Sequence, residues 1–307
     1  MKVEVCLSCS SDQYIFMGKS EGIIDNRNDQ EFVQEAYSIL KCKNCGLYYK
    51  DNILSGEELN EYYNSFDFSL WTPPFPYPTE TIASDFLTNE SGKTSKVLDY
   101  GCSDGRFLSQ FVDNFSCYGY DIDERAILLA KAKGITILDK HELHLSKGSF
   151  DFILLSDVFE HSSQPTKLIE ELFLLMKKDG ALIIITGNAD AKLAKFDLAD
   201  YWYFKNLQHL CMLGDEYVDF LVEKLNCQLT LKKACSHYDE NLIKKGIKRV
   251  IFELRFFLYR NVSVKKHSFQ NNYLKRIPIL KKITKWYTQP FYPYSKDHLI
   301  IVLKKVG

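Results

Sequence analysis

The stretch that decides the fold runs from Lys96 to Leu108 and reads KVLDYGCSDGRFL. It begins as a short apolar strand, passes an acidic residue and a tight turn with two glycines, and leads into the expected start of a helix. The strand brings Asp99 to the turn between Gly101 and Gly105, where a backbone without Cβ atoms can approach a ligand closely. The pattern is typical of the first unit of an α/β fold that binds a nucleoside-containing cofactor.

Three further strands are expected downstream, in an order that suits a mostly parallel sheet. Residues Cys117–Tyr120 form the second strand and lead into Asp121, where an acidic side chain can accept hydrogen bonds from ribose hydroxyls. The third strand is the apolar run Phe150–Asp157, which has the composition of a buried parallel strand. A fourth strand, Ala181–Thr186, follows an expected turn at Lys177–Gly180.

These blocks resemble, in family order, those of the class I S-adenosylmethionine-dependent methyltransferases. The matching stretches are LDYGCSDG, YGYDID, FDFILLSDVFEH and KKDGALIIIT, within residues 95–230. The resemblance implies a Rossmann-like α/β sheet of seven mostly parallel strands with the last strand antiparallel, and S-adenosyl-L-methionine as cofactor. We expect the cofactor to be bound by Asp99, Gly101, Cys102, Gly105, Asp121, Ile122, Ser156 and Asp157. Ser103 stands where the family usually has a glycine, and serine is small enough to keep the resemblance.

A nicotinamide-dependent dehydrogenase or a nucleotide-sugar enzyme is the alternative for a doubly wound fold. Such proteins bind a pyrophosphate at a helix N-terminus through glycines spaced GxGxxG. Here the spacing is GxxxG, and Asp104 inside the turn would repel a pyrophosphate. A cationic sulfonium cofactor has no phosphate and suits a mouth lined by Asp99, Asp104 and Asp121.

Two CxxC pairs near the N-terminus predict a metal site. Cys6 and Cys9 form one pair, and Cys42 and Cys45 form the other. Paired knuckles of this kind present four thiolates to a tetrahedral zinc ion, and four protein ligands leave no open position, so the zinc is expected to be structural. The alternative is four unrelated buried cysteines. The other five cysteines are expected to be reduced core residues, since no secretory segment is recognised before the pairs.

The chain divides into five expected parts. They are a zinc ribbon (1–55), a helical or loop linker with a possible lid (56–94), the cofactor-binding core (95–236), a basic helical insertion (237–296) and the final strand of the core (297–307). The lid is assigned to the proline- and aromatic-rich segment Leu70–Pro78, for which a plain linker is the alternative.

Charge is divided unevenly along the chain. Residues 231–307 hold 18 Lys and Arg against 4 Asp and Glu, a net +14, so the rest hold 21 against 36, a net −15. The basic residues lie mainly between two expected strands, Gln228–Lys233 and His298–Lys304. They suit an interface with anionic lipid or a phosphorylated substrate, whereas a solvated helical cap over the sheet edge is the alternative. Nucleic acid is not expected as a partner, because no RNA-binding module is recognised.

The apolar runs are too short to span a bilayer, which predicts a cytoplasmic protein with at most a peripheral contact at the inner face of the membrane.

Candidate catalytic residues follow the third strand and precede a later helix. Glu160 and His161 stand directly after FDFILLSD, where the resemblance implies a site role, and His209 lies in the segment YWYFKNLQHL. His161 is the first candidate for the base, because the ordinary pKa of histidine lies near the working pH. We expect the aromatic residues Tyr201–Tyr203 to line the acceptor pocket, with a place in the core as the alternative.

The zinc ribbon followed by a methyltransferase core is similar to bacterial methyltransferases of sugar and surface-polysaccharide biosynthesis. This implies a sugar or glycan acceptor, as a nucleotide-sugar, a lipid-linked sugar or a surface polysaccharide, with O- and C-methylation both open. The alternatives are a methyltransferase for a quinone or polyketide precursor, one for RNA, and a non-catalytic S-adenosylmethionine-binding protein. The sequence Ser156-Asp157-Val158-Phe159 lacks the asparagine-proline-proline-aromatic motif of amino-group nucleic-acid methylation.

Overall fold

The computed structural model describes residues 1–27, 30–65, 76–90, 94–196, 198–199, 201–237 and 296–306, together with single residues between 243 and 253. The segment 66–75, which includes most of the predicted lid, and most of the basic insertion lie outside the described residues.

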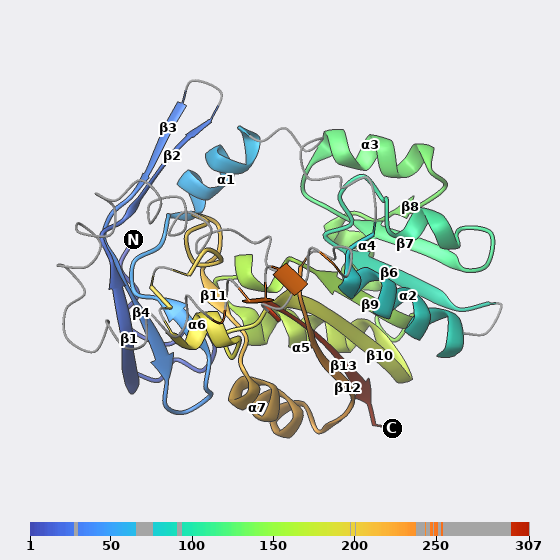
Figure 1. The fold of residues 1–307 in the computed structure, drawn as a ribbon. Coiled ribbons are helices and arrows are strands. Elements are labelled where there is room, and N and C mark those ends of the chain that lie inside the picture. Colours follow the sequence, from blue (N-terminus) through green and yellow to red (C-terminus); the bar gives the residue numbers. More distant parts are fainter. Residues whose placement is uncertain are drawn as a thin grey trace.

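A seven-stranded sheet forms the centre of the molecule (Figure 1). Its strands, in spatial order, are β12 (Cys227–Cys235), β13 (His298–Lys305), β10 (Met176–Gly187), β9 (Phe150–Ser156), β6 (Lys96–Tyr100), β7 (Ser116–Tyr120) and β8 (Thr136–Ile137). The pairs from β10 to β8 are parallel, and β13 is antiparallel to both of its neighbours. The predicted Rossmann-like sheet with its antiparallel last strand is confirmed.

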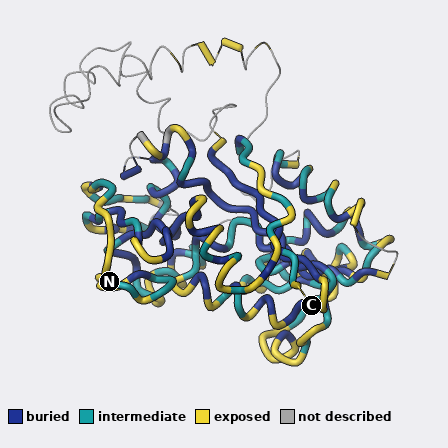
Figure 2. Tube along the Cα trace, turned by 90° about the horizontal axis from the view of Figure 1, so that it is seen from below, coloured by how far each residue is buried: buried dark blue, intermediate teal, exposed yellow. Residues whose placement is uncertain are grey.

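Alternating side chains of the sheet fill two cores, because successive residues of a strand point to opposite faces. In β9, Ile153 belongs to one cluster and Leu154 to the other. The first cluster is covered by α5 (Pro165–Leu175) and α7 (Asp215–Leu225), and the second by α2 (Pro78–Glu90) and α3 (Glu124–Ala132). Figure 2 shows the consequence, with strands mostly buried and exposed residues on the outer turns.

Two local features around these strands differ in detail from the prediction. The segment after the glycine turn is a 3-10 helix, Leu108–Phe111, because only residues 106–115 separate the turn from β7 and their apolar side chains pack into the core. The expected turn at Lys177–Gly180 is an irregularity within the continuous strand β10, where the pairing with β9 shifts between Met176 and Ala181. Lys177 donates to both oxygens of Asp151 there, at 2.9 and 2.8 Å.

The N-terminal part shares a sheet with the core instead of standing apart. Strands β1 (Tyr14–Ser20), β4 (Tyr37–Cys42) and β5 (Tyr48–Lys50) pair in the order β1-β4-β5-β11, and β11 (Cys211–Met212) comes from the core sequence. In Figure 1 these strands lie to one side of the central sheet, with β11 between. Strands β2 (Ile23–Arg27) and β3 (Gln30–Gln34) form a separate hairpin.

The remaining helices connect these layers. Helix α1 (Gly56–Asn64) begins with a capping box between Ser55 and Glu58, and α4 (Lys140–Leu145) and α6 (Lys192–Phe196) are short. A 3-10 helix, Phe159–His161, follows β9 directly. Within the described part of the chain, no helix has the length and apolar composition needed to cross a membrane.

Candidate active site and cysteine cluster

The first part of the site is the turn that joins β6 to the following 3-10 helix. The N–H groups of Gly101 and Cys102 donate to the carbonyl oxygen of Tyr120, at 2.8 and 3.1 Å, so the turn is bonded to the end of β7. Asp121 then accepts the N–H of Ser103 on Oδ2 at 2.7 Å. Parallel pairing of β6 and β7 therefore brings the predicted cofactor residues of both strands together.

The two glycines of this turn are required by the protein's own packing. Gly101 has φ +88° and Gly105 has φ +72°, a left-handed conformation that other residues rarely adopt. A Cβ on Gly101 would lie 2.3 Å from Cγ2 of Val158, and one on Gly105 would lie 2.3 Å from Cδ1 of Ile135. From the sequence alone, these glycines are explained by the close approach of a ligand. The structure shows that neighbouring side chains of the protein already exclude a Cβ at both positions.

Asp99 is a buried carboxylate with an unused acceptor. Its side chain is 4% exposed, and Oδ1 has no hydrogen-bond partner within the described structure. Burial, followed by the charges of Asp121 and Glu80, raises the pKa of Asp99 to about 8. An ammonium group would satisfy this oxygen, so the site fits the cationic amino-acid end of the predicted cofactor.

The other predicted cofactor residues differ in how open they are. Ile122 is 67% exposed beside Asp121, as a surface for a purine ring requires, whereas Cys102 is buried and both its backbone N–H and its carbonyl are hydrogen-bonded within the protein. Ser156 is the last residue of β9, and Asp157, which follows it, adopts φ +52°. All of these residues lie at or directly after the carboxyl ends of β6, β7 and β9, where open α/β sheets bind ligands.

Glu160 points into the protein. It is 1% exposed, and its Oε2 accepts the hydroxyl of Thr186 at 2.8 Å while its Oε1 accepts the hydroxyl of Tyr203. The N–H of Gly187 in turn donates to the Tyr203 oxygen at 2.8 Å. Burial and the nearby charge of Asp157 raise the pKa of Glu160 to about 7. Because donors hold it on both sides, Glu160 is a fixed group beside the two histidines.

His161 and His209 stand beside this carboxylate. The Nδ1 atom of His161 is hydrogen-bonded to the hydroxyl of Tyr63 in α1, and Nδ1 of His209 donates to the carbonyl oxygen of Tyr203 at 2.7 Å. Their ring centroids are 5.1 Å apart. Burial lowers the pKa of His161 to about 4 and that of His209 well below its usual range, so both imidazoles are neutral at neutral pH. The structure thus brings the three predicted catalytic residues together.

The aromatic segment before His209 is mainly core. Tyr201 and Tyr203 are 3% and 1% exposed and pack in a cluster with Tyr37 and Phe204, while Trp202 is half-buried beside it. The hydroxyl of Tyr203 donates to Glu160, so Tyr203 holds this carboxylate in position and, in the described part of the structure, does not itself line a pocket.

Sequence reasoning missed a group of three residues beside Asp157, namely His298, Asp297 and His237. His298, the first residue of β13, has Nε2 3.6 Å from Asp157 and Nδ1 3.4 Å from Asp297, and His237 stacks on it at 4.2 Å between centroids. Although burial lowers the pKa of His298, its close contacts with the two carboxylates raise it to about 10. The adjacent Asp and His at the start of the last strand were the available signal. Tyr63, also missed, had no local signal beyond an aromatic pair in a helix.

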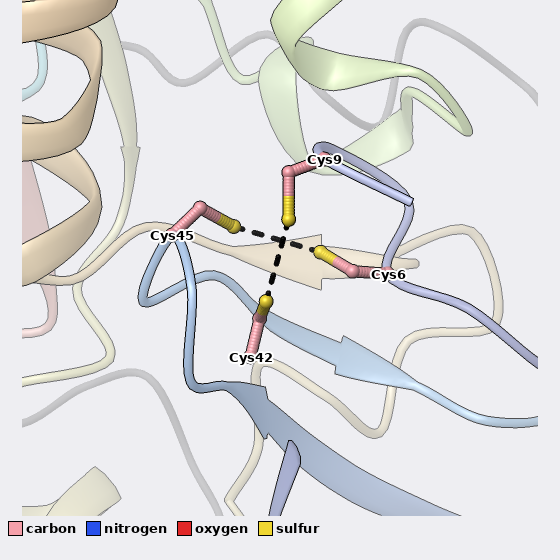
Figure 3. A group of neighbouring side chains, drawn as sticks. All are labelled: Cys6, Cys9, Cys42 and Cys45. Carbon is pink, nitrogen blue, oxygen red and sulfur yellow. Dashed lines mark hydrogen bonds between the residues drawn. The ribbon is translucent and has the colours of Figure 1, made fainter. Parts of the chain in front are cut away.

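The four cysteines of the CxxC pairs converge on one point (Figure 3). Sγ of Cys6 lies 3.5 Å from that of Cys45, and Sγ of Cys9 lies 3.5 Å from that of Cys42, with all four sulfurs within 4.8 Å of one another. Ligands about 2.3 Å from a tetrahedral zinc ion stand about 3.8 Å apart, so the cluster fits that geometry. The other five cysteines occupy buried or half-buried positions.

Comparison with known proteins identifies the family of the central part of the chain. A family model described as a methyltransferase domain matches residues 79–232, half of the chain. An uncharacterized protein of Methanocaldococcus jannaschii is 32% identical over 100 residues, which cover 32% of this chain and 47% of that protein. The match therefore spans about half the length of the curated relative.

Two solved structures show the range of similarity. Phosphoethanolamine N-methyltransferase 2 of Haemonchus contortus, in complex with S-adenosyl-L-methionine, has a TM-score of 0.51 at 14% identity, covering 85% of this chain and 62% of that one. A S-adenosylmethionine-dependent methyltransferase of Archaeoglobus fulgidus has a TM-score of 0.45 at 17% identity, covering 82% and 100%. The first likeness shows the fold alone. Together with the family match and the site at the strand ends, it means that this chain belongs to the methyltransferase domain family.

Proposed function

We propose that the protein transfers a methyl group from S-adenosyl-L-methionine to a sugar or glycan acceptor. The observation that carries the proposal is the edge formed by the ends of β6, β7 and β9. The buried carboxyl group of Asp99, whose Oδ1 has no partner among the described residues, stands near the end of β6, and the fixed carboxylate of Asp121 follows β7. The cluster of Glu160, His161 and His209 follows the end of β9. One edge of the sheet thus has an acidic half, suited to the positively charged cofactor, and a half with two histidines and a glutamate, suited to the acceptor.

On the cofactor side, each residue has a role that its surroundings support. Asp121 would accept the ribose hydroxyls, since its carboxylate is already oriented by the N–H groups of Ser103 and Asp123. Ile122 would pack on the adenine, and Asp99 would pair with the amino group. When bound, the cofactor supplies an electrophilic methyl group on a positively charged sulfur.

On the acceptor side, the neutral imidazoles of His161 and His209 and the carboxylate of Glu160 would receive the reacting oxygen or carbon. The hydrogen bonds of His161 to Tyr63 and of His209 to the Tyr203 carbonyl hold both rings in place. Much of the rate of an in-line transfer comes from such positioning. A neutral imidazole can also accept the proton that a hydroxyl acceptor loses.

The sugar acceptor is supported by the resemblance of the whole arrangement, two CxxC pairs before a methyltransferase core, to enzymes of surface-polysaccharide biosynthesis. The net +14 of residues 231–307 suits a phosphorylated or lipid-linked acceptor. Residues 238–295 can be deleted to test this. Loss of binding to anionic vesicles would support a membrane contact, and unchanged binding would favour a cap over the sheet.

The four clustered cysteines are proposed to hold a structural zinc ion. Beside Cys9, Ser8 contacts Thr166 of α5 and donates to the hydroxyl of Tyr217 in α7 at 3.2 Å. The Thr166 and Tyr217 hydroxyls are themselves 2.8 Å apart. A zinc ion here would therefore fasten the N-terminal sheet to the two helices that cover one face of the central sheet.

Calorimetric titration with S-adenosyl-L-methionine and S-adenosyl-L-homocysteine, with NAD and UDP-sugars as controls, tests the cofactor. We expect micromolar binding of the first pair and none of NAD, and a preference for NAD would contradict the proposal. Transfer of a labelled methyl group to nucleotide-sugars and lipid-linked sugars then tests the acceptor. Transfer only to quinone precursors or to RNA would replace the acceptor class while keeping the enzyme class.

A further inference from the structure

The acceptor half of the site has the composition of a metal centre. We propose that Glu160, His161 and His209 bind a divalent first-row cation such as Zn²⁺, separate from the cysteine cluster. One ligand atom from each residue lies within 4.8 Å of the other two. The proposal deepens the proposed function and rests on it only in placing the acceptor oxygen at this cluster.

The two segments that carry the ligands are bonded to each other. Glu160 and His161 belong to the 3-10 helix after β9, and His209 precedes β11. The N–H of Leu210 donates to the carbonyl oxygen of Glu160 at 2.7 Å, and Sγ of Cys211 lies 3.6 Å from the carbonyl oxygen of Phe159. The ligands are therefore held by backbone contacts and do not depend on a metal to meet.

The hydrogen bonds around the two histidines are compatible with metal ligation. Metal-binding imidazoles donate their second ring N–H to a carbonyl or another oxygen, which orients the ring. His209 does so from Nδ1 to the Tyr203 carbonyl at 2.7 Å, and this leaves the lone pair on Nε2. For His161, the Tyr63 oxygen can accept the Nδ1 hydrogen, since a phenol both donates and accepts, and Nε2 is again left for the cation.

The carboxylate completes the donor set and lacks a compensating charge. Glu160 forms no ion pair with a lysine or arginine anywhere in the described part of the chain, although it is 1% exposed. Its hydrogen bonds from Thr186 and Tyr203 orient both oxygens, and each oxygen keeps a lone pair. A buried carboxylate without a cationic partner is costly, and a divalent cation would offset that cost.

Two imidazoles and one carboxylate make up the ligand set of open catalytic sites, in contrast to the closed set of four cysteines. The free positions of such an ion would bind the acceptor oxygen and lower the pKa of its hydroxyl. His161 then acts as a ligand in place of a base. The acceptor oxygen occupies the same cluster in both cases, so the proposed function does not depend on the ion.

Zinc content per chain gives the first test. The full-length protein is equilibrated with micromolar Zn²⁺, and bound zinc is measured by atomic emission. We expect two equivalents in the parent, one in Glu160→Gln and His209→Gln, and two in the control His144→Ala, which changes an exposed histidine of α4. A single equivalent in the parent, or two in both site variants, would overturn the proposal.

X-ray absorption at the zinc edge gives a second test that needs no variant to fold. A parent with both sites filled shows sulfur at about 2.3 Å and nitrogen or oxygen at about 2.0–2.1 Å in similar numbers. Sulfur alone contradicts the second site. If chelated, single-zinc protein still methylates a sugar at the parental rate, the role of the cation in activating the acceptor is overturned and the proposed function stands. If the second zinc binds but no sugar is methylated, the cation site stands and the proposed function fails.

Discussion

His298 lies between two carboxylates, with Nε2 3.6 Å from Oδ1 of Asp157 and Nδ1 3.4 Å from Oδ1 of Asp297. Because both ring nitrogens face acceptors, the ring is held in its protonated form. It joins the end of β9 to the start of β13, although 141 positions separate Asp157 from His298 in the sequence. The ring of His237, the first residue of the predicted basic insertion, stacks on the ring of His298.

This contact predicts a loss of stability in alkali. The pKa of His298 is about 10 in the folded protein against 6.5 for an ordinary histidine, so its contribution is complete below pH 6.5 and is lost as the pH rises towards 10. His298→Gln should be less stable than the parent by about 3–5 kcal/mol at pH 6, since it removes one partner of a buried pair. Denaturant unfolding between pH 6 and 10 measures this. The difference between parent and variant should shrink with rising pH, and a constant difference would contradict the assignment.

Alanine at Gly101 should destabilise the protein far more than alanine at an unhindered glycine. Gly101→Ala adds a left-handed strain of about 1 kcal/mol and a contact 2.3 Å from Val158 worth about 2 kcal/mol more. Gly148→Ala is the matched control, because Gly148 has φ +62° and no atom near its Cβ position. Equal losses in urea unfolding would show that the clash is unimportant, and Val158→Ala should partly restore Gly101→Ala.

Asp121→Ala should weaken binding of S-adenosyl-L-methionine by about 10- to 100-fold, the effect of removing hydrogen bonds to a charged group. Calorimetry of the folded variant measures this, and Asp113→Ala, which removes an exposed carboxylate before β7, is the control. Unchanged affinity would place the ribose elsewhere. The variant should also lose some stability, because Asp121 accepts the N–H groups of Ser103 and Asp123.

Tyr63→Phe should reduce turnover about 10-fold with little change in cofactor affinity, because the hydroxyl is hydrogen-bonded to His161 and orients its ring. The neighbouring Tyr62→Phe is the control, since the Tyr62 hydroxyl donates to Asp25 at 2.7 Å, away from the site. Methyl-transfer rates at saturating cofactor compare the two. A parental rate in Tyr63→Phe, or an equal loss of rate in both variants, would contradict the proposed role of Tyr63 in orienting His161.

Cys42→Ser should lose the zinc of the cysteine cluster and lower the melting temperature, because metal binding contributes directly to folding in such sites. Cys235→Ser, a half-buried cysteine outside the cluster, should keep the metal. Zinc content and thermal unfolding are measured together. Full zinc content in Cys42→Ser would contradict the structural site.

Much of the fold could be predicted because its signals are local. The apolar runs that became β6, β7, β9 and β10 can be recognised within ten residues, and the glycines of the first turn mark a left-handed backbone. Even Ser103 fits this rule, since it adopts φ +47° where the family usually has a glycine. The CxxC pairs predicted four convergent thiols for the same reason, as each knuckle is a short-range turn.

What the sequence alone determined was therefore the sheet, the set of residues at the strand ends that are proposed to bind the cofactor, and the cysteine cluster. Only the tertiary structure decided that Tyr63 meets His161 across 98 residues, that Glu160 turns inward to Thr186, and that β11 extends the N-terminal sheet. Those contacts arise when distant segments pack on the same edge of the sheet. They depend on how separate elements share buried volume and satisfy buried polar groups, which no short stretch of the chain specifies.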